Sequence, residues 1–203
     1  MTTHIMLDLE TLGVGTMPAI ATIGAVRFDP EGDDIVSPAA YRGSVADAGT
    51  FFYCMIDIDS CRAAGAAIEG ATLNWWMQPE QEPARKYSFP IGDSPTQSVP
   101  LSFVLREFHT WYDWSKREAE AIWGHGATFD VTILQSAYHA IGGTPPWGYR
   151  APRDTRTLFS LAEPEWPANP VLHHPLWDAW CQAKAVQSSY RKLRATKESA
   201  ALP

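Results

Sequence analysis

The chain contains few cysteines and no long apolar run. Its three cysteines, Cys54, Cys61 and Cys181, are an odd number without a CxxC spacing, which argues against a disulfide framework and against a zinc site. No apolar segment is long enough to span a bilayer, and no basic region followed by an apolar core marks the N-terminus. We therefore expect reduced thiols in a cytoplasmic protein without a membrane anchor or a secretory signal.

Net positive charge is also absent, since the formal charge is −7 at pH 7. This balance argues against a general nucleic-acid coat, but it is compatible with an enzyme whose bound metal cations contact phosphate. Five basic residues without an acidic one occur between positions 184 and 197. Two interpretations remain open for this stretch, a solvated face of a terminal helix and a patch that contacts phosphate. Its basic residues are Lys184, Arg191, Lys192, Arg194 and Lys197.

What the sequence does have is enough apolar side chains for one core. With 203 residues, 45% of them hydrophobic, we expect a single domain over 1–203. Its core should span about 4–191, followed by a basic tail over 192–203. The nine tryptophans are numerous for this length. Most are expected to anchor the core or loops, and one or two exposed aromatic rings could stack on bases.

Local patterns predict an alternation of strands and helices. Apolar residues at helical spacing predict a helix over 101–114, and 71–87 is expected to be helical at least as far as Pro79. Between them, 88–100 contains three prolines and a glycine, which predicts a loop. Apolar segments rich in β-branched residues predict three neighbouring strands of one sheet. These segments are 5–9, 21–28 and 51–56.

The first apolar segment is the most informative because it carries two acids. Asp8 and Glu10 are separated by one residue. Side chains alternate along a strand, so both carboxylates point to the same face. Burial of two neighbouring ionised carboxylates is costly unless a cation neutralises them. A divalent metal site is therefore the first hypothesis, and an edge strand with a solvated Asp and Glu is the alternative.

Another acid follows a glycine-rich turn. A short apolar run leads into Gly124, and Thr128 is the predicted N-cap of the helix that follows. Asp130 lies four residues before Leu134, on the inward-facing stripe of this helix. A carboxylate at this position is either part of a shared acidic site or a partner of the helix N-terminus.

A histidine and a further acid open the last predicted helix. Pro175 suits the first turn of a helix, which places His173 in the preceding loop and Asp178 about one turn inside. A loop histidine can bend back over the site that a first-turn carboxylate faces. The alternatives are a surface histidine and an aspartate that interacts with the helix dipole. His174 is the rival of His173 for any chemical role.

These motifs follow one another from Ile5 to about Arg191, nearly the whole chain. Asp-x-Glu on a first strand, Phe-Asp after a glycine-rich turn and His-x4-Asp on a late helix resemble the DEDDh branch of the 3′-to-5′ exonuclease superfamily. A double-Trp helix at 72–78 resembles its small bacterial and phage members, and 153–158 resembles the strand before their final helix. The resemblance implies an α/β domain with a ribonuclease H-like fold, a mixed five-stranded central sheet flanked by helices, with the acidic site at one sheet edge.

Two positions depart from the pattern of that family. His125 stands where the family usually has Asn, and Pro175 replaces the Ala of His-x-Ala-x-x-Asp. Neither change removes an expected metal ligand. The first bears on contacts around the scissile nucleotide, and the second bears on the position of the loop that carries His173.

The resemblance implies two divalent ions and a histidine base. Asp8, Glu10 and Asp178 are expected to hold the ion that binds the attacking water. Asp8 also bridges to the second ion, which Asp130 supports. Oxygen ligands favour Mg²⁺ or Mn²⁺, and His173 is the expected general base because its ordinary pKa is near neutral. The residues expected to bind substrate are Thr11, Leu12, His125, Phe129, Arg191, Lys192 and Arg194.

Together these features predict a metal-dependent 3′-to-5′ exonuclease that removes nucleoside 5′-monophosphates from single-stranded DNA or RNA ends. An inactive, exonuclease-like module that binds nucleic acid or a protein partner is the alternative. A metalloenzyme acting on small phosphates is disfavoured because no phosphate-binding loop is recognisable. No motif distinguishes DNA from RNA, since the contacts that read the 2′-OH lie in loops. The surplus of aromatic residues leaves room for a homodimer contact.

Overall fold

The computed structural model describes residues 2–41, 49–89, 98–113 and 119–200. Within these ranges the strands form a five-stranded sheet in the order β3-β2-β1-β4-β5. The pairs β1–β2 and β2–β3 are antiparallel, whereas β1–β4 and β4–β5 are parallel. This arrangement confirms the predicted α/β class with a mixed five-stranded sheet. The strands are β1 (His4–Thr11), β2 (Ile20–Phe28), β3 (Phe51–Met55), β4 (Ala121–Gly124) and β5 (Pro152–Asp154).

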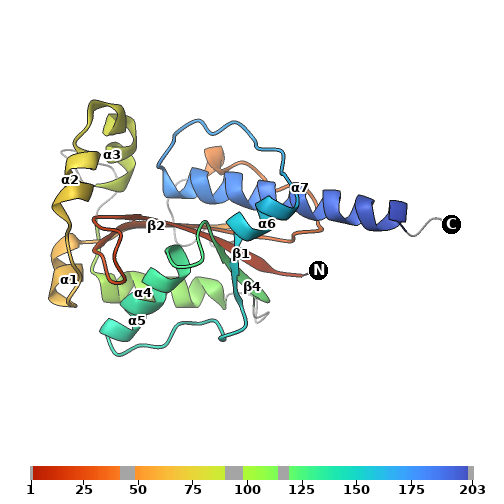
Figure 1. The fold of residues 1–203 in the computed structure, drawn as a ribbon. Coiled ribbons are helices and arrows are strands. Elements are labelled where there is room, and N and C mark those ends of the chain that lie inside the picture. Colours follow the sequence, from red (N-terminus) through yellow and green to blue (C-terminus); the bar gives the residue numbers. More distant parts are fainter. Residues whose placement is uncertain (1, 42–48, 90–97, 114–118, 201–203) are drawn as a thin grey trace.

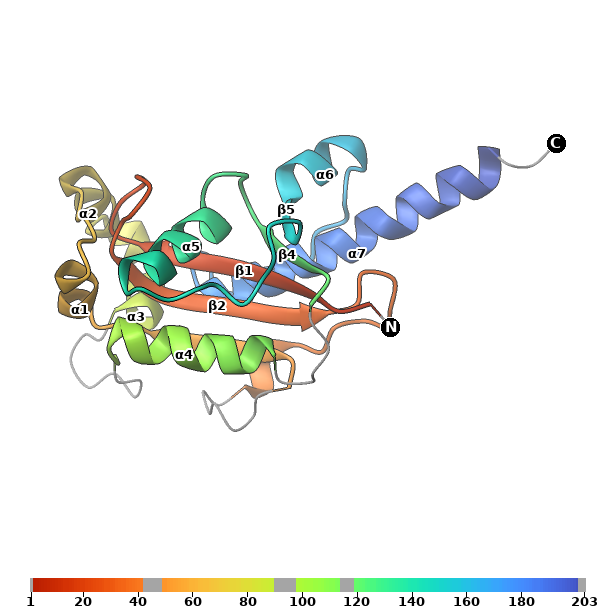
Figure 2. The ribbon, with the colours of Figure 1, turned by 90° about the horizontal axis from the view of Figure 1, so that it is seen from below.

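Helices cover both faces of the sheet and one of its ends. In Figures 1 and 2, α4 and α5 lie on one face, α7 runs along the other, and α1, α2 and α3 gather beyond the end of β1. The helices are α1 (Ile58–Ala63), α2 (Gly70–Trp76), α3 (Glu82–Ser88), α4 (Leu101–Tyr112), α5 (Asp130–Ala140), α6 (Thr155–Leu161) and α7 (Pro175–Ala200). The 3₁₀ turns among the described residues are η1 (Pro38–Ala40) and η3 (Pro79–Gln81).

Side-chain alternation along β1 decides which face of the sheet carries the acids. Ile5 and Leu7 belong to the core cluster that α4 and α5 complete, whereas Met6 packs with α7 on the opposite face. Asp8 and Glu10 continue the alternation of Met6, so both carboxylates lie on the α7 face. The sheet therefore presents its two acids to the helix that carries the last motif.

A glycine in β2 lets the start of α7 approach the sheet. Gly24 pairs with Asp8 of β1. A Cβ atom at position 24 would lie only 2.3 Å from the carbonyl carbon of Pro175. Any other residue would push the first turn of α7 away, because this contact is with backbone rather than with a flexible side chain. The absence of a side chain at Gly24 thus brings α7 directly against the acidic part of the sheet.

Most predicted elements are confirmed. The three strands form where the apolar segments predict them. The helix expected over 101–114 is confirmed as far as Tyr112, and Trp114 lies outside the described residues. The helix expected from 71 at least as far as Pro79 is shorter than predicted, because α2 ends at Trp76, before the proline-led turn η3. Of the loop predicted over 88–100, Ser88 is the last residue of α3, and 90–97 lie outside the described residues.

Three local predictions are wrong. Thr128 does not cap α5, because Phe129 occupies the N-cap position and no side chain bonds there. The strand expected over 153–158 ends at Asp154, whose carboxylate accepts the first N–H groups of α6 and so starts a helix. The acids do not lie at a sheet edge, since β1 is the middle strand.

The predicted basic tail is a continuation of α7. Residues 192–200 are helical and mostly exposed, and this end of α7 projects beyond the sheet (Figure 1). Within the described ranges, no helix combines the length and the apolar character that crossing a membrane requires.

Candidate active site

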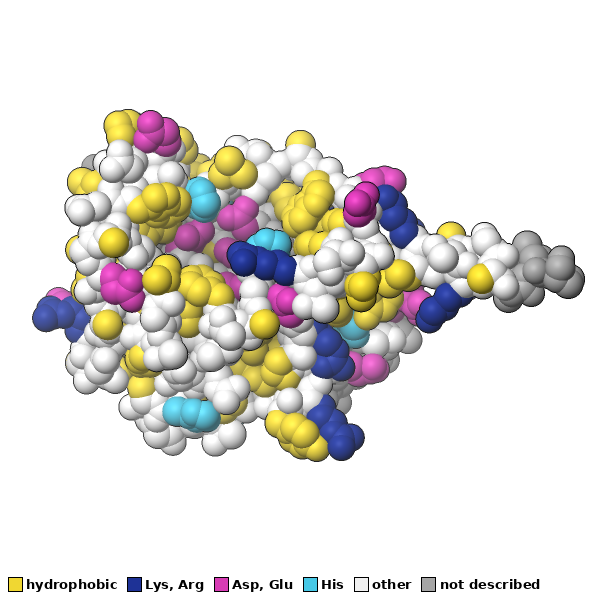
Figure 3. All heavy atoms as spheres, in the orientation of Figure 1, with side chains coloured by type: hydrophobic (Ala, Val, Ile, Leu, Met, Phe, Trp, Pro, Cys, Tyr) yellow, Lys and Arg dark blue, Asp and Glu magenta, His cyan; other side chains and the backbone are white. Residues whose placement is uncertain are grey.

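Four carboxylates from three distant segments converge at one cleft. Asp8 and Glu10 come from β1, Asp130 is the first residue of α5, and Asp178 lies in the first turn of α7. The cleft has a volume of about 660 Å³. Figure 3 shows acidic side chains gathered in a hollow near the middle of this face, with hydrophobic side chains on both sides. The structure thus brings together the four acids that the sequence singled out.

Asp130 is fixed by backbone hydrogen bonds. Its Oδ1 accepts the N–H of Leu9 at 3.1 Å and its Oδ2 accepts the N–H of His125 at 2.9 Å. The side chain is 2% exposed, and a Cβ at Gly124 would lie 3.1 Å from its Oδ2. Burial raises the pKa of Asp130 to about 6, although these hydrogen bonds oppose that shift. The Asp130 carboxylate therefore links β1 to the turn that follows β4.

Glu10 is buried and Asp8 is half-buried, and both lie beside the other acids. Gln182 of α7 donates its side-chain N–H to Oδ1 of Asp8 at 2.8 Å. Burial raises the pKa of Asp8, and the negative charges of Asp130, Asp178 and Glu10 raise it further. Burial also raises the pKa of Glu10, which is 8% exposed. Both carboxyls thus lack the compensation that an ionised carboxylate needs in a low-dielectric site.

Asp178 is oriented by the loop that precedes α7. Its carboxylate accepts hydrogen bonds from the side-chain amide of Asn169 and from the backbone N–H of His173. Asn169 is itself held, because its Oδ1 accepts the N–H of Val171 at 3.1 Å. Burial raises the pKa of Asp178 to about 6. The loop and the first turn of α7 therefore form one hydrogen-bonded unit.

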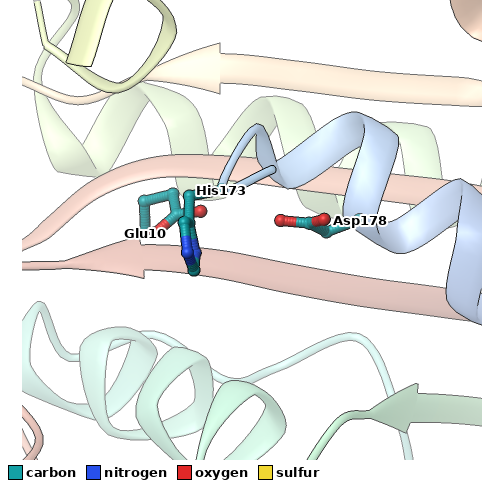
Figure 4. Close-up of side chains that lie close together, drawn as sticks. All are labelled: Glu10, His173 and Asp178. Atoms are coloured by element: carbon teal, nitrogen blue, oxygen red, sulfur yellow. The ribbon is translucent and has the colours of Figure 1, made fainter. Parts of the chain in front are cut away.

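His173 lies beside two of the acids. Potential ligand atoms of Glu10, His173 and Asp178 lie within 4.8 Å of one another. In Figure 4, the His173 ring lies next to Glu10, and the carboxylate of Asp178 points from α7 toward both side chains. The backbone of His173 has φ of 59°, a left-handed conformation that turns the chain back over the sheet. Its ring meets the edge of Trp75 at 4.9 Å between centroids, and partial burial lowers its pKa.

The rival histidine points elsewhere. His174 is 9% exposed, and its ring stacks on Tyr53 with 5.1 Å between centroids and contacts Tyr87 at 4.7 Å. Its Nδ1 accepts the N–H of Leu176 at 3.3 Å, and burial lowers its pKa to about 4. The geometry therefore favours His173 over His174 for a chemical role.

The donor set fits a divalent metal ion. Four carboxyls offer oxygen ligands, which suit Mg²⁺ or Mn²⁺, and burial raises the pKa of each of them, so a bound cation would favour their ionised forms. Glu10, His173 and Asp178 are already close enough to share one ion. These residues therefore have both the chemistry and the proximity that metal binding requires.

The residues expected to bind substrate separate into two groups. Thr11, His125 and Phe129 line the cleft. Leu12 does not; it is 4% exposed and packs in the core cluster. The three basic residues of α7 that were expected to bind substrate, Arg191, Lys192 and Arg194, also lie outside the cleft lining. Their side chains are exposed or engaged locally, as when Lys192 donates to the carbonyl of Glu163 at 2.7 Å and Arg194 pairs with Glu198 at 3.0 Å.

Sequence reasoning missed several residues that shape the cleft. Gln182 is four residues after Asp178, so helical periodicity places it on the same face of α7 and could have revealed it. Gly24, inside a strand, signals a close backbone approach. Asn169 has no signal of its own, because its role depends on how the loop folds. The cleft is also lined by Val14, Glu69, Ala71, Thr72, Trp75, Trp76 and Arg156.

Solved structures of exonuclease I share this fold. E. coli exonuclease I in complex with a dA16 oligonucleotide has a TM-score of 0.56 at 15% identity, over 98% of this chain and 43% of that one. The zinc-bound E. coli exonuclease I–ssDNA complex gives 0.53 at 13% identity, over 98% and 43%. Exonuclease I from Methylocaldum szegediense gives 0.52 at 13% identity, over 98% and 41%. The chain thus spans less than half of these exonuclease I chains, and the likeness confirms the predicted ribonuclease H-like fold.

Sequence comparison identifies the family. A search of curated proteins gives no match. The family model described as the 3′-5′ exoribonuclease Rv2179c-like domain matches residues 3–190, nearly the whole chain. The match includes all four acids and His173. The chain therefore belongs to the Rv2179c-like family of 3′-5′ exoribonuclease domains, and the resemblance of its motifs to DEDDh-type 3′-to-5′ exonucleases is confirmed.

Proposed function

We propose that this chain is a metal-dependent 3′-to-5′ exonuclease that removes nucleoside 5′-monophosphates from single-stranded nucleic acid. The observation that carries the proposal is the convergence of four carboxylates, two buried and two half-buried, with His173 at one cleft. Family membership and the oligonucleotide complexes of exonuclease I support the substrate class. A cluster of uncompensated acids has no stabilising value without a cation, so its presence favours turnover over an inactive binding module.

Asp8, Glu10, Asp130 and Asp178 would hold the metal ions. Two divalent ions bound there would lower the pKa of the attacking water and neutralise charge that develops on the phosphate and the leaving oxygen. Gln182 and Asn169 orient two of these carboxylates through hydrogen bonds to Asp8 and Asp178. Such fixed partners keep the ligand oxygens in place before substrate arrives.

His173 is proposed as the general base. Partial burial lowers its pKa, so the ring is neutral at pH 7 and one ring nitrogen can accept a proton from the attacking water. The ring borders Glu10 and Asp178 and is restrained by the edge of Trp75. After proton transfer, the imidazolium is stabilised by the carboxylates around it.

One end of the cleft is suited to the terminal nucleotide. Glu69 accepts the N–H groups of Val14 and Gly15 at 3.1 and 3.0 Å, which ties the loop after β1 to the start of α2. Trp76 donates its Nε1–H to the carbonyl of Thr11 at 3.0 Å. These contacts build a wall across the end of β1. A nucleic-acid strand can therefore place its terminal nucleotide here more readily than an internal nucleotide.

The proposal is tested by the direction of degradation. Single-stranded DNA and RNA labelled at the 5′ end should shorten one nucleotide at a time in Mg²⁺ or Mn²⁺, and a blocked 3′ end should stop the reaction. Asp8→Asn serves as the matched inactive control. Comparison of the two substrates also decides the DNA or RNA preference. Cleavage of a closed circular strand, or full activity in a folded Asp8→Asn protein, would contradict the proposal.

A further inference from the structure

An aromatic cluster with one exposed member borders the cleft on the side away from α2. It consists of His125, Phe159 and Trp166. Trp166 meets Phe159 edge-on with 5.2 Å between centroids and His125 with 6.4 Å, and His125 lies 6.2 Å from Phe159. Trp166 is nevertheless 51% exposed, which is a large apolar surface to leave in water. Within this cluster, His125 also lines the cleft.

We propose that Trp166 stacks on the base of a nucleotide upstream of the one being removed, while Arg156 contacts a phosphate between the two. The inference rests on the proposed exonuclease function and extends it to the path of the strand. Every base has a π-face, so a ring at this position would bind single-stranded DNA and RNA alike.

The position of Trp166 is fixed before any ligand arrives. The loop between α6 and α7 is tied to α7 at its beginning: Ser189 donates to the carbonyl of Ala162 at 3.0 Å, and Ser188 accepts the N–H of Glu165 at 3.0 Å. Lys192 adds a third contact through the carbonyl of Glu163 at 2.7 Å. A ring held in this way loses little conformational entropy on binding.

Arg156 supplies the positive charge that the acidic cleft otherwise lacks. It is exposed at the start of α6 and lines the cleft. A Cβ at Gly126 would lie 3.8 Å from its guanidinium carbon, so the group sits against the turn that leads to Asp130. Among the residues that the structure describes, Arg156 forms no salt bridge within 4.0 Å. Its charge interacts with the carboxylates of Asp130 and Asp154 at longer range, and its guanidinium N–H groups can still form a bidentate contact with phosphate.

The two sides of the cleft would then bind different parts of the nucleic-acid strand. Figures 1 and 2 both place α2 and α6 on opposite sides of the C-terminal part of β1. The wall at α2, with Trp75 and Trp76, holds the terminal nucleotide, and the acids lie between the walls. The upstream strand therefore leaves past Arg156 and Trp166. This path does not require the basic residues at the end of α7 to touch the first nucleotides.

Substrate length tests the inference. The p-nitrophenyl ester of thymidine 5′-monophosphate has no upstream base, whereas trinucleotides and longer strands of DNA or RNA do. Relative to the ester, Trp166→Ala should raise KM for the longer strands by about five- to hundredfold, and Trp166→Phe should restore most of the loss. Tyr149→Ala is the matched control, since Tyr149 is an aromatic residue that is 87% exposed and lies outside the cleft lining.

Abasic substrates locate the stacked base. In the Asp8→Asn background, which blocks turnover, removing one base at a time should weaken binding most at a single upstream position. That penalty should vanish when Trp166→Ala is added. Arg156→Gln should lower the slope of log affinity against log salt by about 1. Equal penalties with and without Trp166, or an equal rise in KM for the ester, would overturn the inference. A wild-type protein that hydrolyses neither substrate would overturn the proposed function instead.

Discussion

Both halves of α7 contain polar residues, but the two halves lie in opposite environments. From Pro175 to Ser189 most residues are buried, including the polar Gln182, Gln187, Ser188 and Ser189. From Arg191 onward nearly all side chains are exposed, and this half projects beyond the sheet (Figure 2). Exposed charges are solvated and contribute little, whereas a buried polar group persists only where something satisfies it. The half with buried polar residues is therefore where the chemistry is expected.

Replacing Asp178, the acid in the first half of α7, should have the largest effect on turnover. Asp178→Asn keeps the volume of the side chain and removes its charge, so the fold should persist while kcat falls by about 10³-fold or more, the worth of metal stabilisation of the transition state. Steady-state rates and thermal unfolding of the purified variant check this. Substantial turnover by a folded Asp178→Asn protein would show that α7 does not contribute to the active site.

Replacing the histidine next to that acid should have the second-largest effect. His173→Ala should lower kcat by roughly 10²- to 10⁴-fold with metal affinity little changed, as expected for the loss of a general base. His174→Ala is the matched control, and it should mainly lower the melting temperature because His174 packs between Tyr53 and Tyr87. Loss of metal binding in His173→Ala would make this residue a ligand rather than a base. A larger rate loss in His174→Ala would exchange the two roles.

Two buried glutamines of the first half provide a finer comparison. Gln182 bonds to Asp8, whereas Gln187 donates to the carbonyls of Asp29 and Asp33 at 2.8 and 3.0 Å, away from the cleft. Gln182→Leu should weaken metal affinity or activity by about 10- to 100-fold, because it frees a ligand carboxylate to rotate. Gln187→Leu should lower stability and leave the metal dependence of the rate unchanged. Equal metal dependence in both variants would remove the special role of Gln182.

The stabilising effect of Mg²⁺ should fade as the pH falls from about 7 to 5. Burial raises the pKa of Asp130 and of Asp178 to about 6, so the folded protein binds protons that the unfolded chain, with carboxyl pKa values near 3.9, does not. Without metal, the free energy of unfolding contributed by these groups therefore rises as the pH falls through this range. Bound Mg²⁺ competes with the same protons.

Melting temperatures with Mg²⁺ and with EDTA check this dependence. Their difference should be largest near neutral pH and should approach zero near pH 5. Burial lowers the pKa of His4 and His174 to about 4, and their effect on stability is present in both conditions, so it cancels in the difference. A constant difference across this range would show that Mg²⁺ binds elsewhere.

Changing the charges in the second half of α7 should have the smallest effect on the reaction. Neutralising Arg191, Lys192 and Arg194 together should weaken binding of long strands and flatten its salt dependence, with a slope change of about 1 for each phosphate that the protein no longer neutralises. The rate of the chemical step should be spared, since none of the three lines the cleft. A fall in the single-turnover rate equal to that of Asp178→Asn would place this half of α7 at the site.

Local periodicity was sufficient to predict the shared face of Asp8 and Glu10 but not the surroundings of the acids. Alternation along β1 places Asp8 and Glu10 on one face, and this is confirmed. The prediction of Thr128 as the N-cap of α5 was wrong, because Phe129 holds that position. The carboxylate of the next residue, Asp130, accepts a hydrogen bond from Leu9, a strand residue that is far away in sequence. The bond between Gln182 and Asp8 likewise spans 174 positions. Contacts of this kind depend on how α7 docks, which no local pattern records.

Direct metal titration tests the site most closely, because it does not depend on substrate or turnover. Calorimetric titration of the metal-free protein with Mn²⁺ at neutral pH should show binding that requires the carboxylates of both β1 and α7. Asp8→Asn and Asp178→Asn should each weaken this binding strongly, while Lys197→Gln, in the exposed half of α7, should match the wild type. The metal-free Asp8→Asn protein should melt no lower than the wild type, since a repulsion between buried charges is relieved. Unchanged Mn²⁺ binding in both aspartate variants would contradict a metal site built by β1 and α7.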